Sequence, residues 1–132
     1  MMNRLNINTL TFTLCFLLAT SVTVADEITY IDIHQAKQLH DQGALFIDTR
    51  TWIERKFGII KGSVFMKKSE VADVAQYLIT DENQTVVTYC AVGVRASDAA
   101  AVLSELGYTN LYVIANGQGY SHWKKAGYPT SR

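Results

Sequence analysis

The chain has 132 residues, with 12 Lys and Arg against 12 Asp and Glu, so its formal net charge is zero. This length is enough for one domain with a hydrophobic core and too short for two. The balanced charge argues against nucleic-acid binding, which normally requires clustered basic residues.

The N-terminal 25 residues have a pattern of their own. Arg4 is the one charged residue before the apolar run at 10–19, and Ala25 immediately precedes the first acidic residues. A charged start, a short apolar run and a small residue at the end are the three parts of a secretory signal peptide. The run is shorter than the ~20 residues of a membrane-spanning helix. We therefore expect cleavage of 1–25, leaving 26–132 as one periplasmic domain without stable membrane association; an uncleaved anchor is the alternative.

Short runs of β-forming residues alternate with helical runs in the rest of the chain. We expect strands at 27–33, 44–48, 62–66, 85–90 and 110–114. We expect helical segments at 34–43, 51–58, 69–79, 96–107 and 119–127, with Ser69 as the N-cap of the third and Gly107 ending the fourth. This alternation predicts an α/β fold with a central parallel sheet of about five strands and helices on both faces.

One edge of that sheet is the predicted site. Ligands of open parallel sheets bind beyond the carboxyl ends of the strands, where Asp48 and Cys90 fall. The other cysteine, Cys15, lies in the segment expected to be removed. A lone cysteine cannot form an internal disulfide, so Cys90 either packs in the core or reacts.

The six residues "CAVGVR" (90–95) join a strand end to a helix start. Backbone N–H groups converge at such a place, and the helix dipole adds partial positive charge. Gly93 permits a left-handed turn, and Arg95 adds a guanidinium suited to oxyanions. Cys90 alone is more typical of core packing, but these neighbours favour a nucleophilic thiolate in an anion-binding loop.

Three segments carry a resemblance to a known family. "CAVGVRAS" (90–97) resembles the active-site loop Cys-x-x-Gly-x-Arg of the rhodanese family of sulfurtransferases. Residues 46–66 resemble its second signature, an Asp-x-Arg followed by Glu and then Gly-His-Ile-Pro-Gly-Ala, and 106–129 resemble its ending. The chain departs from the pattern at Ile59, Lys61 and Asn116, which stand where the family has His, Pro and Gly.

The resemblance implies a single rhodanese-like domain that transfers sulfane sulfur. The Cys90 thiolate would take sulfur from a thiosulfate-like donor, become a persulfide, and pass the sulfur to cyanide or a thiol. The resemblance also implies that Arg95 binds the anionic donor and that no metal or organic cofactor takes part. A monomer is expected. The residues expected to bind substrate are Ala91, Val92, Gly93, Val94, Arg95 and Ala96.

Three charged residues near the predicted site are expected to support it structurally, although a direct part in the site stays open. We expect Asp48 to bind the backbone of neighbouring loops and Arg50 to pair with Glu54, four residues further on. Trp52 and Trp123 are expected in the core or at a pocket edge. The three histidines lack the spacing of metal ligands.

Two other functions remain open from the residues. Phosphatases and arsenate reductases also place a cysteine before an arginine, but tyrosine and dual-specificity phosphatases have five residues between them, and this chain has four. The shorter loop suits one sulfur atom better than a tetrahedral phosphate. A sulfur carrier without turnover is the second alternative. A disulfide oxidoreductase is disfavoured because there is no resolving thiol.

Overall fold

The computed structural model describes residues 27–132, so the predicted signal peptide lies outside the described residues. Strands and helices alternate along this part of the chain. The elements are β1 (Thr29–Ile31), α1 (Ile33–Asp41), β2 (Leu45–Asp48), α2 (Trp52–Arg55), β3 (Ile59–Ile60), β4 (Val64–Phe65), the 3₁₀ turn η1 (Lys68–Glu70), α3 (Val71–Leu78), β5 (Val86–Tyr89), α4 (Val94–Glu105), β6 (Leu111–Ile114), α5 (Tyr120–Lys125) and β7 (Thr130–Ser131).

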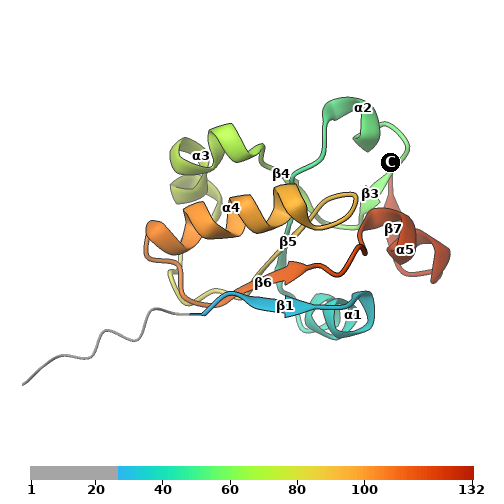
Figure 1. Cartoon of the computed structure of the whole chain (residues 1–132), viewed down its shortest axis with the longest axis horizontal. Helices are drawn as coiled ribbons and strands as arrows, with labels where there is room; N and C mark the ends of the chain where they lie inside the picture. The colour runs from blue at the N-terminus through green and yellow to red at the C-terminus, as the bar shows by residue number, and fades with distance from the viewer. Residues whose placement is uncertain (1–26) are drawn as a thin grey trace, which may run out of the picture.

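The main sheet has five strands in the order β1-β6-β5-β2-β4, and every neighbouring pair is parallel. Strand β5 lies at the centre, between β6 and β2 (Figure 1). In the register of β2 and β5, Asp48 stands opposite Tyr89. The chain therefore leaves both strands at the same edge, and the residues after Asp48 emerge beside Cys90. The predicted α/β fold is confirmed.

Helices cover both faces of this sheet. Alternate residues of a strand point to opposite faces, and the adjacent residues Val86 and Val87 belong to different core clusters. Val87 packs with residues of α1 and α5, including Trp123, whereas Val86 packs with residues of α3 and α4, including Leu103. The strands are consequently apolar on both sides, which is why they appear as continuous hydrophobic runs.

A second sheet was not predicted. Strands β3 and β7 pair antiparallel over two residues each. The Lys61 N–H extends this pairing by donating to the carbonyl oxygen of Pro129 at 3.0 Å. The family signature has proline, which has no N–H, at the position of Lys61. The departure from the signature therefore supplies a donor that ties the C-terminus to the segment before β4.

Two helix starts differ from expectation. Ser69 lies inside η1, and α3 begins only at Val71, so the predicted N-cap is wrong. A hydroxyl within the preceding turn is not placed to bind the first free N–H groups of the helix. Helix α4 begins at Val94, two residues before the predicted start, because Gly93 takes a left-handed conformation (φ 103°) as its N-cap. Gly107 follows α4, also with positive φ, as predicted.

No helix within residues 27–132 is both long enough and apolar enough to span a bilayer.

Candidate active site

Cys90 lies directly after the central strand β5, and its side chain is buried, with 1% of the residue exposed. The backbone N–H of Gly93 points at its Sγ, at an N···Sγ distance of 3.1 Å. Sulfur at this position thus accepts a hydrogen bond from the loop that leads into α4. This is the donor arrangement that a buried thiolate or persulfide needs, because an unpaired charge would be costly there.

Two glycines allow the loop to take this shape. A Cβ atom on Gly93 would lie 3.1 Å from both the Ala115 Cα and the Ile114 carbonyl oxygen, in addition to the strain of positive φ. A Cβ atom on Gly119 would collide with the carbonyl oxygens of Cys90 and Ala91. The loop therefore packs directly, backbone against backbone, on the segment between β6 and α5.

Arg95 is bound by Glu54. Its Nη1 and Nη2 donate to the two carboxylate oxygens of Glu54 at 2.7 and 2.8 Å. Thr51, the N-cap of α2, also donates its N–H to Glu54 at 2.8 Å. The hydrogen bond from Arg95 is the main reason that the pKa of Glu54 falls to about 2. In turn Glu54, and to a smaller extent the Cys90 thiol, raise the pKa of Arg95.

The predicted salt bridge between Arg50 and Glu54 is wrong, because Arg50 Nη1 reaches only the Glu54 carbonyl oxygen, at 3.5 Å. Arg50 instead binds the Asp48 carboxylate through Nε at 3.0 Å and Nη2 at 2.8 Å, and both side chains are buried. Burial opposes the charge of Arg50, but the hydrogen bonds and charge of Asp48 outweigh it and raise its pKa. Arg50 Nη2 also donates to the Gly58 carbonyl at 2.7 Å. Asp48 Oδ1 also accepts the backbone N–H of Arg50 at 3.0 Å, so Asp48 binds loop backbone as predicted, and Arg50 extends the contact to the loop at Gly58.

Tyr89 completes this buried cluster. Its hydroxyl donates to Asp48 Oδ2 at 2.8 Å, accepts the Ile60 N–H at 3.1 Å, and lies 2.8 Å from Ser63 Oγ. Burial, followed by the charge of Asp48, raises the pKa of Tyr89 well above its usual range. The cluster joins the end of β2, the end of β5 and the last residue of β3, so it fixes the edge of the sheet from which Cys90 emerges.

The remaining residues of the predicted loop differ in exposure. Val92 and Val94 expose their side chains, Ala91 is half-buried, and Ala96 is buried within α4. The structure brings Glu54 to Arg95, whereas Asp48 and Arg50 form a separate pair. Substrate binding by the loop residues stays a prediction.

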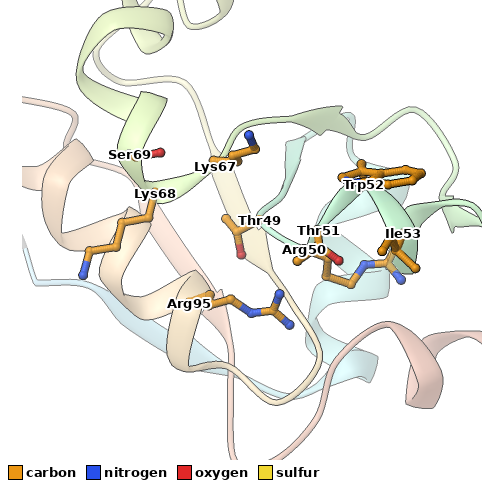
Figure 2. A pocket seen from close by; sticks show the side chains of 9 residues that line it. All are labelled: Thr49, Arg50, Thr51, Trp52, Ile53, Lys67, Lys68, Ser69 and Arg95. Carbon is orange, nitrogen blue, oxygen red and sulfur yellow. The ribbon is translucent and has the colours of Figure 1, made fainter.

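Two pockets open beside the loop. The smaller, about 250 Å³, is lined by Arg50, Glu54, Phe57, Ala91, Tyr120 and Ser121. The larger, about 470 Å³, lies between α2, η1 and the start of α4 (Figure 2). Its lining residues are Thr49, Arg50, Thr51, Trp52, Ile53, Lys67, Lys68, Ser69 and Arg95. Both tryptophans were expected in the core or at a pocket edge. Trp52 lies at the edge of this pocket, and Trp123 is in the core.

Among residues 27–132, no group of three or more His, Cys, Asp or Glu side chains is placed to hold a metal ion. His34 and His40 instead make ordinary contacts, with the Tyr128 hydroxyl at 2.6 Å and the Lys61 carbonyl at 2.8 Å respectively.

The family model of the rhodanese-like domain matches residues 32–126. Two curated relatives are tRNA uridine(34) hydroxylases. That of Hamiltonella defensa is 27% identical over 67% of this chain, and that of Buchnera aphidicola is 29% identical over 70%. The matched region is 26% and 32% of their respective lengths, so the chain spans about a quarter to a third of these proteins.

Solved structures share the fold. A rhodanese-related protein of Thermoplasma volcanium is 25% identical, with a TM-score of 0.63, over 78% of this chain and 97% of the other. A human single-domain sulfurtransferase is 22% identical, with a TM-score of 0.63, over 75% and 97%. A possible tyrosine phosphatase of Rhodopseudomonas palustris is 25% identical, with a TM-score of 0.69, over 79% and 85%.

Proposed function

Because the chain belongs to the rhodanese-like family, we propose that it is a sulfurtransferase that carries sulfane sulfur on Cys90. The observation that carries this proposal is the Gly93 N–H, which points at the Cys90 Sγ at 3.1 Å. A second sulfur bound to Sγ would remain within the loop that leads into α4, where helix N–H groups and the helix dipole favour negative charge.

The proposed reaction has two steps. In the first, the Cys90 thiolate attacks the outer sulfur of a thiosulfate-like donor. A new S–S bond forms, the donor's S–S bond breaks, and sulfite leaves with the bonding electron pair. In the second, cyanide or a thiolate attacks the outer persulfide sulfur, and the electron pair returns to Cys90 Sγ. Neither step needs a redox partner or a cofactor.

Arg95 is the proposed contact for the anionic donor. Its guanidinium is bound to Glu54, and its side chain is 37% exposed, so a donor can approach it. The donor would then share the guanidinium with the Glu54 carboxylate, or displace it. We further propose that the protein acts as a monomer in the periplasm after removal of residues 1–25, on the basis of the three-part pattern of that segment.

A phosphatase is the second candidate, because one similar structure is that of a possible tyrosine phosphatase. The four residues between Cys90 and Arg95 favour a single sulfur atom over a phosphate group. A tRNA substrate like that of the curated relatives is disfavoured by the zero net charge of this chain, because nucleic-acid binding normally requires clustered basic residues.

Intact-mass measurement after incubation with thiosulfate tests the proposal. We expect the protein to gain one sulfur atom, cyanide to remove it, and the Cys90→Ser variant to gain none. Thiocyanate formation should follow the same pattern. If the wild-type protein gains no sulfur and instead hydrolyses p-nitrophenyl phosphate with Cys90-dependent turnover, the phosphatase replaces the sulfurtransferase.

A further inference from the structure

The larger pocket does not match the small ions of the proposed reaction. Its volume is about 470 Å³, whereas cyanide has two atoms and thiosulfate five. Pockets for organic ligands are typically about 300–1,000 Å³ and mostly apolar, with a few polar groups that orient the ligand. Figure 2 places its walls on three elements, with Trp52 and Ile53 on α2, Lys67 to Ser69 at η1, and Arg95 on α4.

The apolar wall consists of side chains that the core does not use. Trp52 is 58% exposed and Ile53 is 54% exposed, and α2 buries none of its residues. The Lys56 ammonium lies 4.3 Å from the centroid of the Trp52 ring, which limits the freedom of that ring. Two neighbouring large apolar side chains left in water beside a pocket indicate a surface that a ligand covers.

The charged residues of the pocket are all cations. They are Arg50, Lys67, Lys68 and Arg95, and no carboxylate residue lines the pocket, although the chain as a whole has no net charge. The Arg95 guanidinium is directed across the pocket toward α2 (Figure 2). Arg50 and Arg95 are already paired with Asp48 and Glu54, so the two lysines are the cations most open to an anion.

The two lysines are available to such an anion. Lys67 lies 3.5 Å from Glu70, and Lys68 lies 3.0 Å from Asp98, and all four side chains are between 45% and 59% exposed. Exposed ion pairs of this kind contribute only about 0–1 kcal/mol, so a bound anion can compete for either lysine.

The pocket lies next to the Cys90 loop, although Cys90 itself does not line it. Thr49 lines it, and the N–H and hydroxyl of Thr49 both donate to the carbonyl oxygen of Tyr89, at 3.0 and 2.9 Å. Tyr89 is the residue before Cys90. From the other side, Arg95 lines the pocket and belongs to the Cys90 loop. A ligand seated here therefore contacts Arg95, in the Cys90 loop, and Thr49, which is bonded to the residue before Cys90.

We propose that this pocket binds an organic thiol with an aromatic or branched apolar body and a carboxylate, and that this thiol is the sulfur acceptor. The apolar body packs on Trp52 and Ile53, and the carboxylate meets Lys67. The acceptor role rests on the proposed function; binding to the pocket does not. In the transfer, R–S⁻ and Cys90–S–SH give R–S–SH and Cys90–S⁻. The new S–S bond forms as the persulfide bond breaks, and Cys90 Sγ keeps the electron pair.

Direct binding to the Cys90→Ser protein tests the pocket without any chemistry. Titration calorimetry compares 4-(mercaptomethyl)benzoate, which has ring and charge, with benzyl mercaptan, which lacks the charge, and 3-mercaptopropionate, which lacks the ring. We expect the first to bind at least tenfold more tightly than either of the others.

Protein variants test which residues form the pocket. Trp52→Ala and Lys67→Gln should each weaken the binding of 4-(mercaptomethyl)benzoate at least threefold. Tyr77→Ala removes an aromatic residue that is 76% exposed and outside the pocket, and should leave binding unchanged. Equal binding of the three thiols, or indifference to Trp52→Ala, overturns the proposal.

Single-turnover transfer from preformed persulfide tests the acceptor role. Trp52→Ala should raise the half-saturating concentration of 4-(mercaptomethyl)benzoate by a larger factor than that of cyanide, and Tyr77→Ala should leave both unchanged. If the persulfide forms but passes to all three thiols with equal efficiency, the acceptor assignment is wrong and the sulfurtransferase stands. If no persulfide forms, the proposed function fails, and the binding measurements still decide whether the pocket takes such a ligand.

Discussion

Arg95 and Glu54 form a two-point ion pair, with Nη1–Oε2 and Nη2–Oε1 distances of 2.7 and 2.8 Å. The pair joins α2 to the first turn of α4 and lies beside the Cys90 loop. Glu54 therefore has two roles. Its carboxylate binds Arg95, and it also accepts the N–H of Thr51, the N-cap residue of α2. An anionic donor that uses Arg95 must therefore compete with a carboxylate that is already in place.

Replacement of Glu54 by Gln should release Arg95 for the donor. An exposed or half-exposed ion pair is worth up to about 1 kcal/mol, so we expect the KM for thiosulfate to fall by up to about fivefold. Steady-state thiocyanate formation measures it, with Glu105→Gln at the far end of α4 as the matched control. A KM that rises instead means that Arg95 needs Glu54 for its position.

The same pair predicts a pH dependence of stability. The pKa of Glu54 is about 2 in the folded protein, chiefly because Arg95 donates to it, against an ordinary value of 4.5. A lowered pKa stabilises the fold above pH 4.5, and this contribution is lost as the pH falls from 4.5 toward 2. In urea unfolding, the wild-type protein should therefore have a higher free energy of unfolding than Glu54→Gln, and this difference should shrink as the pH falls from 4.5 toward 2. A difference that stays constant from pH 6 to pH 2.5 contradicts the assignment.

Removal of the guanidinium should impair donor binding rather than folding. Hydrogen bonds to charged groups are worth about 1.5–3 kcal/mol, so Arg95→Ala should raise the KM for thiosulfate by roughly tenfold or more. Arg95→Lys should recover part of this loss, because the charge returns without the two-point geometry. Both variants should keep the wild-type circular dichroism spectrum. An unchanged KM in Arg95→Ala removes this residue from the donor site.

Gly93→Ala should disrupt the Cys90 loop. The added methyl group meets Ala115 and Ile114 at 3.1 Å, and the residue must keep a positive φ. Gly62→Ala is the matched control, because φ at Gly62 is +81° but a Cβ there meets no atom within 4 Å. We expect backbone strain to lower the free energy of unfolding of both variants by about 1–3 kcal/mol. Only Gly93→Ala should fail to form the persulfide. Intact mass and urea unfolding separate the two effects; equal sulfur loading of both variants contradicts the role of the loop geometry.

The features that the sequence predicted correctly depend on neighbouring residues. The apolar run at Val86 and Val87 predicts a strand buried on both faces, and Cys90 with Gly93 predicts the loop that follows it. These patterns are local, because strand periodicity and turn conformation are properties of a few consecutive residues. The alternation of short β-forming runs with helical runs along the sequence predicted the parallel sheet.

The features that it missed depend on residues far apart in the chain. Arg50 and Glu54 are four residues apart, but Arg50 precedes Thr51, the N-cap of α2, so the two do not share a helical face. The true partner of Glu54 is 41 positions away. The larger pocket likewise combines three separate segments. Its apolar residues could equally have been core residues, and only the structure shows that α2 buries none of them.

Tyr89→Phe tests whether the buried cluster supports the fold rather than the chemistry. The substitution removes a hydroxyl that donates to Asp48 and accepts the Ile60 N–H, so it leaves a buried amide without its partner. Such a group costs about 1–3 kcal/mol, and we expect the free energy of unfolding in urea to fall by that amount. Asp48 keeps Arg50 as a partner, so the cluster should weaken without collapsing. The kcat should stay within about twofold of wild type, because Tyr89 makes no contact with the proposed donor.

Tyr30→Phe is the control. It removes an exposed hydroxyl bonded to Ser97 and should change the free energy of unfolding by no more than about 0.5 kcal/mol. A Tyr89→Phe protein of wild-type stability but low kcat would instead place this hydroxyl in the reaction.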